Sequence, residues 1–181
     1  MPKREVNRVL LSSEEIDEKV SELARKIEND YAGKEIVVIP ILKGSMIFVS
    51  DLMRKIGNRV SVIVDVFSVS SYEGTEYGGK ARINLDLITN LKGKDVLIVD
   101  DIVDTGNTMN YIIHLLKYQR PKTLKVCALL TKPSRRAEGV AVCIDYLGFS
   151  IDNHFVVGYG LDYNQQYRNL PYIGILSQGL E

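Results

Sequence analysis

The feature that most constrains the fold is a run of apolar residues that ends in two adjacent carboxylates. Residues 96–99 are Val-Leu-Ile-Val, and Asp100 and Asp101 follow directly. A continuous β-branched run of this kind is typical of a strand covered on both faces, as in parallel α/β sheets. Such sheets bind ligands beyond the carboxyl ends of their strands. The sequence therefore predicts that the acid pair lies at a ligand-binding edge of a parallel sheet.

Asp104 and the small polar residues after it favour a phosphate site. Residues 105–108 are Thr-Gly-Asn-Thr, and a helical pattern of apolar residues follows them. A loop that leads into a helix N-terminus presents backbone N–H groups that bind phosphate. The alternative is an ordinary turn in which Thr105 or Asn107 caps the helix. Neither a G-x-x-x-x-G-K-S/T nor a G-x-G-x-x-G pattern occurs, which disfavours triphosphatase and dinucleotide sites.

The adjacent acids Asp100 and Asp101 place a condition on the backbone. Neighbouring side chains of an extended strand point to opposite faces, so both carboxylates reach one ligand only if the chain turns there. The alternative is a pair of solvated charges at a strand end. Together with a phosphate loop, the acids predict a ligand that has a phosphate at one end and hydroxyls or a metal ion at the other.

Strand and helix patterns alternate along most of the chain. Ser12 and Glu15 form a capping-box pattern, and a helix is predicted from there to Gly33. Buried strands are predicted at residues 35–42, 60–67, 95–100 and 124–131, with helices at 46–56 and 107–118. Weaker strand patterns occupy residues 82–87, 140–147 and 155–157, and a mobile loop or hairpin is expected at about 68–81. The alternation predicts an α/β fold with a mainly parallel central sheet flanked by helices. The terminal segments are expected to form a small cap, within a single domain of residues 1–181.

The charge balance and the cysteines narrow the class of protein. The chain has 23 Lys and Arg residues against 23 Asp and Glu residues, which argues against broad attachment to nucleic acid or anionic membrane. No long apolar run indicates a signal peptide or a membrane span. Cys127 and Cys143 lie in apolar strand-like segments, so we expect reduced packing residues in a cytoplasmic protein. His114 and His154 belong to no metal-ligand pattern and are expected to be non-catalytic.

A second strand-to-helix turn, Leu42-Lys43-Gly44-Ser45, is either another anion site or an ordinary turn. With this turn, the pattern extends to a known family. Residues 96–109 resemble the phosphoribosyl-diphosphate signature of type I phosphoribosyltransferases. The turn at 42–45, Ser70-Ser71-Tyr72 and the segments 129–136 and 155–163 resemble the hypoxanthine-guanine phosphoribosyltransferases, in the same order and at similar spacing. One departure is Asn107, where some members carry Lys.

The resemblance implies a fold, a reaction and a cofactor. It implies the type I phosphoribosyltransferase fold and a purine-salvage enzyme. Such an enzyme transfers the 5-phosphoribosyl group from phosphoribosyl diphosphate to hypoxanthine or guanine, and releases IMP or GMP with pyrophosphate. Magnesium is the implied cofactor, and a homodimer or homotetramer is the implied assembly.

The resemblance also implies roles for individual residues. Asp104 is catalytic, beside purine N7. The residues that bind the phosphoribosyl group are Asp100, Asp101, Asp104, Thr105, Gly106, Asn107 and Thr108. Those that bind pyrophosphate are Lys43, Gly44 and Arg168, and those that bind the purine are Lys132, Phe155 and Val156. The magnesium ligands are Asp100, Asp101 and Asp162. Ser71 and Tyr72 lie on a lid loop.

Residue chemistry agrees with two of these roles. A cationic donor at Lys132 suits a carbonyl oxygen and disfavours an exocyclic amine, so adenine is expected to be a poor substrate. The alternative for Lys132 is a solvated loop charge. A free Asp has a pKa of about 3.9 and is a weak base at neutral pH. We therefore hypothesise that the charge of Asp104 matters more than full proton abstraction.

Two other functions remain open on the sequence. One is a regulatory protein of the same fold that senses phosphoribosyl diphosphate and binds nucleic acid, which the neutral charge balance disfavours. The other is a phosphoribosyltransferase for another base, such as xanthine or a pyrimidine. Lys132 and Phe155 favour a purine, and xanthine differs from hypoxanthine only at the 2-position.

Overall fold

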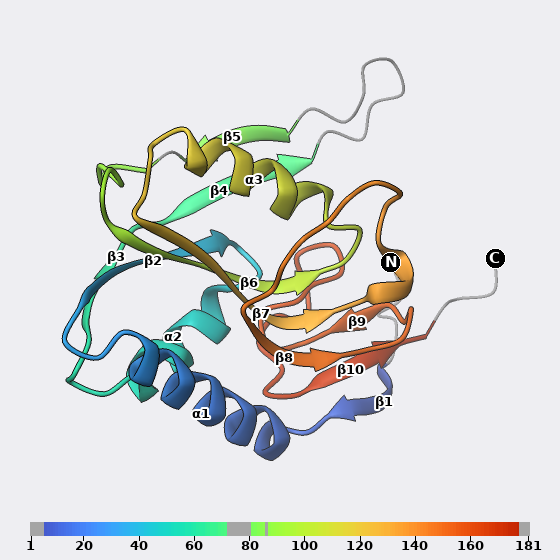
Figure 1. Ribbon diagram of the computed structural model, residues 1–181. Coiled ribbons are helices and arrows are strands. Elements are labelled where there is room, and N and C mark those ends of the chain that lie inside the picture. Colours follow the sequence, from blue (N-terminus) through green and yellow to red (C-terminus); the bar gives the residue numbers. More distant parts are fainter. Residues whose placement is uncertain (1–5, 72–80, 86, 178–181) are drawn as a thin grey trace.

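The computed structural model describes residues 6–71, 81–85 and 87–177 (Figure 1). Its strands are β1 (Val6–Leu11), β2 (Glu35–Leu42), β3 (Ser61–Val64), β4 (Phe67–Ser71), β5 (Ala81–Leu85), β6 (Asp95–Val103), β7 (Thr123–Thr131), β8 (Tyr146–Ser150), β9 (Val156–Val157) and β10 (Ile173–Leu176). Its helices are α1 (Ser13–Asp30), α2 (Met46–Lys55) and α3 (Asn107–Lys117), with a 3-10 turn η1 (Pro133–Arg135). Within the described ranges, no helix is long and apolar enough to span a membrane.

The central sheet is mainly parallel, as expected. Its order is β5-β4-β2-β6-β7-β8, with β3 beside β2. All neighbouring pairs in it are parallel except β4 with β5. Strand β6 therefore lies in the middle, between β2 and β7. Helices α1 and α2 cover one face and α3 covers the other (Figure 1).

Strand β6 is buried on both faces, which confirms the expectation drawn from its apolar run. Leu97 and Val99 belong to the core beneath α1 and α2. Val96 and Ile98 belong to the core beneath α3. Side chains that alternate between two covered faces remove the polar positions a half-exposed strand would have. The two acids of β6 therefore come directly after a fully buried segment.

The two ends of the chain pair with each other in a second sheet. It has the order β1-β10-β9, and both pairings are antiparallel. This sheet is the cap that the terminal segments were expected to form. Strands β1 and β10 were not predicted, because β1 carries mostly exposed or half-exposed residues and pairs with β10 through two register shifts.

Helix α1 begins with the predicted capping box. The Glu15 N–H donates to Ser12 Oγ at 3.2 Å, and the Ser12 N–H donates to Glu15 Oε2 at 2.7 Å. The buried face of α1 is the set Ile16, Val20, Leu23, Ala24 and Ile27. This helix packs against α2.

Two strand predictions need correction. The predicted strand at 140–147 is wrong, because β8 begins only at Tyr146. Val142 and Ile144 nevertheless pack against the core beneath α3, so an unpaired segment produces the alternating pattern. Cys143 lies on this segment and is exposed, so it is not the packing residue expected, whereas Cys127 is buried in β7. Burial raises the pKa of the Cys127 thiol, which keeps it protonated.

The predicted strand at 60–67 is two strands, β3 and β4, which are interrupted at Asp65. The loop or hairpin expected at about 68–81 begins and ends as the antiparallel pair β4 and β5. Residues 72–80, which include Tyr72 of the expected lid, lie outside the described residues.

Asp65 carries a testable pH dependence. Its buried carboxylate accepts hydrogen bonds from the N–H groups of Ile88 and Thr89, at 2.9 and 2.6 Å. Burial alone would raise the pKa of Asp65, but these hydrogen bonds outweigh it and lower the pKa below 3.8. A carboxyl group whose pKa is lower in the folded than in the unfolded state stabilises the fold at pH values above the unfolded-state pKa. This stabilisation is lost as the pH falls through the folded-state pKa.

Asp65→Asn is therefore expected to lose about 1–3 kcal/mol of stability at pH 7. The difference in stability between the variant and the wild type should shrink when the pH falls below 3.8, the ordinary pKa of an Asp carboxyl. Urea unfolding at pH 7 and pH 3 measures this, with the exposed Asp152→Asn as control. A pH-independent difference would contradict the assignment.

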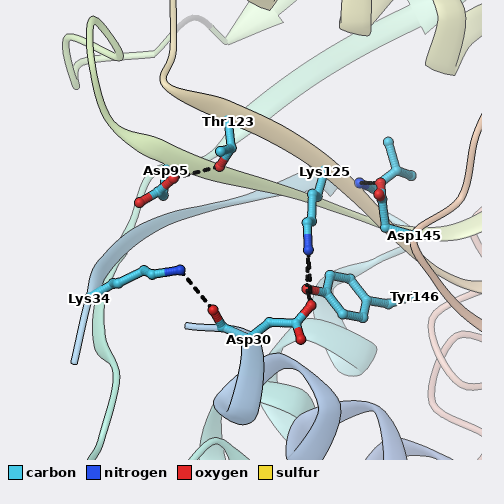
Figure 2. A network of polar contacts seen from close by, with 8 residues as sticks. Asp30, Lys34, Asp95, Thr123, Lys125, Asp145 and Tyr146 are labelled. Atoms are coloured by element: carbon cyan, nitrogen blue, oxygen red, sulfur yellow. Dashed lines mark hydrogen bonds and ion pairs between the residues drawn. The ribbon is translucent and has the colours of Figure 1, made fainter. Parts of the chain in front are cut away.

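The amino ends of β6 and β7 carry a polar network on the side away from the carboxyl ends (Figure 2). Asp30 at the end of α1 accepts hydrogen bonds from the Tyr146 hydroxyl at 2.6 Å and from Lys125 Nζ at 2.9 Å. These contacts lower the pKa of the Asp30 carboxyl. Asp95 accepts a hydrogen bond from the Thr123 hydroxyl at 2.7 Å. These groups are paired with one another and fasten α1 to the sheet.

Candidate active site

The site forms where three neighbouring strands end. The turn at 43–45 follows β2, Asp104 follows β6 and Lys132 follows β7. Val103 pairs with Thr131 in the last register position of β6 and β7, so Asp104 and Lys132 leave the sheet side by side. Parallel pairing thus brings together residues that are far apart in sequence.

The acid pair does not lie at a turn. β6 continues through both residues to Val103, so the expected change of direction comes only after them. The Asp101 N–H donates to Asp100 Oδ1 at 3.1 Å, and this hydrogen bond holds the Asp100 carboxyl toward the next residue of the strand. Burial and the neighbouring Asp101 raise the pKa of Asp100 well above its ordinary value, and burial also raises the pKa of Asp101. Asp100 is buried and Asp101 is half-buried, so the acids are an interacting pair and not solvated charges.

The turn after β2 lies directly against the acid pair. A Cβ atom added at Gly44 would lie 1.9 Å from Asp101 Oδ2, so only glycine fits beside this carboxylate. A Cβ atom at Gly160 would lie 2.1 Å from the Gly44 carbonyl oxygen. The buried Ser45 hydroxyl donates to the Ile41 carbonyl at 2.7 Å and fixes the turn to β2. The peptide bond between Leu42 and Lys43 is cis.

Gly44→Ala tests this close contact. The added methyl must displace either the Asp101 carboxylate or the turn, and a displacement of about 1 Å at a reacting centre can cost about 100-fold in rate. We expect the Gly44→Ala variant to lose about 100-fold in the catalytic efficiency kcat/KM of the phosphoribosyl transfer that the sequence predicts. Steady-state kinetics and thermal unfolding of the two variants measure it, with the exposed Ser50→Ala on α2 as control. Wild-type kinetics in the Ala variant would show that the contact is dispensable.

The loop after β6 surrounds a small cavity at the start of α3. The cavity has a volume of about 90 Å³ and is lined by Asp100, Ile102, Val103, Asp104, Thr105, Gly106, Thr108 and Met109. Gly106 precedes the first residue of α3 with a φ of 83°, a conformation that favours glycine. The N-terminus of the eleven-residue α3 thus faces a polar loop, the arrangement that binds phosphate. Asn107 is exposed at the first position of this helix.

A charged cluster stands at the edge of this cavity. Lys132 Nζ lies 3.2 Å from Asp104 Oδ2, and Arg135 Nε lies 3.2 Å from Asp104 Oδ1. The Lys132 side chain is only 8 % exposed, which excludes the solvated loop charge. Asp104 therefore presents a carboxylate held between two cations.

The remaining predicted residues lie on the segment from β9 to β10. Arg168 forms an ion pair with Asp162 at 2.6 Å and donates to the Gly160 carbonyl at 2.7 Å. Burial raises the pKa of Asp101, and the positive charge of Arg168 partly offsets this increase. Because Gly160 lies against Gly44, Arg168 is brought next to the turn that carries Lys43 and Gly44.

Phe155 and Val156 differ in exposure. Phe155 is 45 % exposed, and its ring meets the Tyr163 ring edge to face with 5.6 Å between the ring centroids. Val156 is buried in β9 and pairs with Ile175. Ser71 ends β4, and Tyr72 lies outside the described residues.

Sequence reasoning missed two arginines of the site. Arg135 and Arg136 entered the sequence analysis only within the segment 129–136, yet both contact Asp104, one at the carboxylate and the other at the carbonyl. The signal available was their position three and four residues after Lys132, in the turn that follows β7. His114 and His154 join no such cluster, and the described residues contain no group of three His, Cys, Asp or Glu side chains that could hold a metal ion.

Comparison with known proteins gives a consistent family. Residues 10–164 match the family model of the phosphoribosyl transferase domain. The chain is 41 % identical over 177 residues to the hypoxanthine-guanine phosphoribosyltransferase of Bacillus subtilis, covering 97 % of this chain and 96 % of that protein. The crystal structure of a hypoxanthine-guanine phosphoribosyltransferase from Bacillus anthracis superposes with a TM-score of 0.87 at 42 % identity, covering 97 % of this chain and 100 % of that one.

Some relatives are much longer. The chain is 44 % identical over 173 residues to the bifunctional protein TilS/HprT of Listeria innocua, covering 95 % of this chain. It spans only 26 % of that relative's length. The match therefore concerns one part of the bifunctional protein.

Proposed function

The chain belongs to the phosphoribosyltransferase family, within its hypoxanthine-guanine group, and on that basis we propose that it is a purine-salvage enzyme. It transfers the 5-phosphoribosyl group from phosphoribosyl diphosphate to hypoxanthine or guanine. The products are IMP or GMP and pyrophosphate. The names of the relatives support the class of reaction, and the geometry of the site supports the roles of its residues.

The observation that carries the proposal is the pair formed by Lys132 and Asp104. A 6-oxopurine presents O6 and N7 on one edge. The Lys132 ammonium and the Asp104 carboxylate lie side by side and match this edge. The ammonium can donate to the carbonyl oxygen O6, and the carboxylate can accept from an N7–H group. The pair stands at the edge of the cavity below α3, so the base and the 5′-phosphate bind next to each other. The partly exposed Phe155 ring supplies a surface for stacking of the base.

The acid pair and the neighbouring turn serve the sugar and the leaving group. Cleavage of the bond from C1 to pyrophosphate gives the sugar cationic character, which the carboxylates Asp100 and Asp101 favour. Negative charge gathers on pyrophosphate, which Lys43 and Arg168 stabilise together with the backbone at Gly44. Arg168 must then exchange part of its contact with Asp162 for the ligand.

The acid pair also fits a magnesium ion. Burial and the repulsion by Asp101 raise the pKa of Asp100, and a divalent cation between the two carboxyl groups and the ligand would relieve this repulsion. Magnesium takes one or two protein carboxylates and completes its shell with water and phosphate oxygens, so a three-residue cluster is not required. Bound there, magnesium would neutralise developing charge on the leaving group. Asp162 is the candidate for a second ion. Removal of magnesium with a chelator is expected to abolish transfer, and its return to restore it.

A panel of bases tests the proposal. The purified chain, magnesium and phosphoribosyl diphosphate are combined in turn with hypoxanthine, guanine, xanthine, adenine and a pyrimidine, and nucleotide is quantified by chromatography. We expect product from hypoxanthine or guanine and little from adenine. Product from xanthine or the pyrimidine alone would support a phosphoribosyltransferase for another base. Binding of phosphoribosyl diphosphate without product from any base would support the regulatory alternative. We further propose a cytoplasmic homodimer or homotetramer that acts without nucleic acid or membrane, in a single domain with a lid around residues 68–81.

A further inference from the structure

Arg136 connects the ends of the two strands that carry the site. Its Nη2 donates to Thr131 Oγ1 at 2.9 Å at the end of β7, and its Nη1 donates to the Asp104 carbonyl at 3.2 Å after β6. The buried Thr131 hydroxyl donates onward to the Val103 carbonyl at 3.3 Å. A single guanidinium therefore holds two consecutive carbonyls of one strand end, one directly and one through Thr131.

Arg136 also lies against the outside of the phosphate loop. A Cβ atom added at Gly106 would lie 2.8 Å from Arg136 Nη1 and 3.1 Å from Val140 Cγ1. The Ala137 N–H donates to the Thr105 carbonyl at 3.0 Å, so the backbone after Arg136 holds the same loop. The cavity at the start of α3 lies inside this loop, and Arg136 is not one of its lining residues.

The two neighbouring arginines therefore act on Asp104 in different ways. Arg135 contacts the carboxylate, whose charge it partly neutralises. Arg136 contacts the backbone carbonyl and leaves the carboxylate oxygens to Lys132, Arg135 and the ligand. Because arginine offers several donors in a fixed planar fork, it can hold Thr131 and Asp104 at one set distance.

We propose that Arg136 is a positioning residue for phosphoribosyl transfer, which rests on the function proposed above. It fixes the spacing between the pair that reads the purine edge, Lys132 and Asp104, and the loop that holds the 5′-phosphate. Base and sugar are thereby held in register for attack at C1, although Arg136 touches neither. A neutral residue at position 136 keeps Lys132, Asp104 and the loop in the site, but no longer fixes the distance between the pair and the loop.

Arg136→Gln and Arg136→Lys test this role, with the exposed Arg25→Gln on α1 as a charge-matched control. We measure kcat and the KM values for hypoxanthine and phosphoribosyl diphosphate, and the folded fraction by thermal unfolding. The Gln variant should lose about 10- to 100-fold in kcat per folded molecule, with KM changed less than kcat. The Lys variant should recover part of the loss, because its ammonium can still donate to the Asp104 carbonyl.

Thr131→Val provides a milder second variant, which removes the hydroxyl between Arg136 and Val103. We expect a loss of about three- to ten-fold in kcat, and little further loss when it is combined with Arg136→Gln, because both changes break one network. Two results would overturn the positioning role while the function stands. One is a double variant whose loss in kcat equals the product of the two single losses, and the other is an Arg136→Gln variant that keeps the wild-type kcat per folded molecule. A wild-type protein without transfer would overturn both.

Discussion

Asp104→Asn is expected to reduce kcat for IMP formation by about 10²- to 10⁴-fold, the range that a positioned acid–base group supplies. The carboxylate lies between Lys132 and Arg135, at 3.2 Å from each. Asparagine has nearly the same shape and its amide oxygen can still accept from one of them, so the fold should survive. The variant loses the negative charge that we propose stabilises N7–H as the base becomes a nucleotide. Steady-state kinetics at saturating substrates measures the loss.

Asp17→Asn on the exposed side of α1 is the matched control for this change, and it should keep the wild-type kcat. Thermal unfolding of both variants separates a loss of chemistry from a loss of folded protein. An Asp104→Asn variant within a few-fold of wild type in kcat would contradict both proton abstraction and electrostatic stabilisation by this residue.

Lys132→Gln is expected to raise the KM for hypoxanthine and to lower kcat/KM by about 100-fold, because a charge-assisted hydrogen bond to the purine oxygen contributes about 1.5–3 kcal/mol. The side chain is almost fully buried, so no other cation takes its place from solvent. Gln can also accept a hydrogen bond, so discrimination against adenine should weaken at the same time. The KM for phosphoribosyl diphosphate should change much less.

The comparison of hypoxanthine with adenine is the informative readout for this variant. Lys117→Gln, on the exposed face of α3, removes the same charge elsewhere and should leave both bases unaffected. A Lys132→Gln variant with an unchanged ratio of kcat/KM for the two bases would show that another group reads the purine 6-position.

The sequence predicted the carboxyl-terminal edge of the sheet well, and the reason is physical. Strands β2, β6 and β7 are buried on both faces, so their sequences are continuous apolar runs whose polar ends are easy to locate. Parallel pairing then places Lys43, Asp104 and Lys132 at one edge without further information. The resemblance to a known family supplied their individual roles.

Features that depend on tertiary packing could not be predicted in the same way. The mostly exposed or half-exposed strand β1 pairs with the short strand β10, which also pairs with β9. Residues 140–145 resemble a strand because Val142 and Ile144, on one side of this segment, are partly buried against the core. The acid pair interacts through a local hydrogen bond that no pattern reveals. The role of Arg136 follows only from the distances that it bridges between two strand ends.

Simultaneous quantification of pyrophosphate and IMP tests whether the chain transfers the phosphoribosyl group to a 6-oxopurine. The purified wild-type chain is incubated with magnesium and phosphoribosyl diphosphate, with and without hypoxanthine. We expect pyrophosphate to be released only when hypoxanthine is present, in amounts equal to the IMP formed. Folded protein that releases no pyrophosphate, or releases it at the same rate without a base, would contradict the claim that Lys132 and Asp104 hold a 6-oxopurine for transfer.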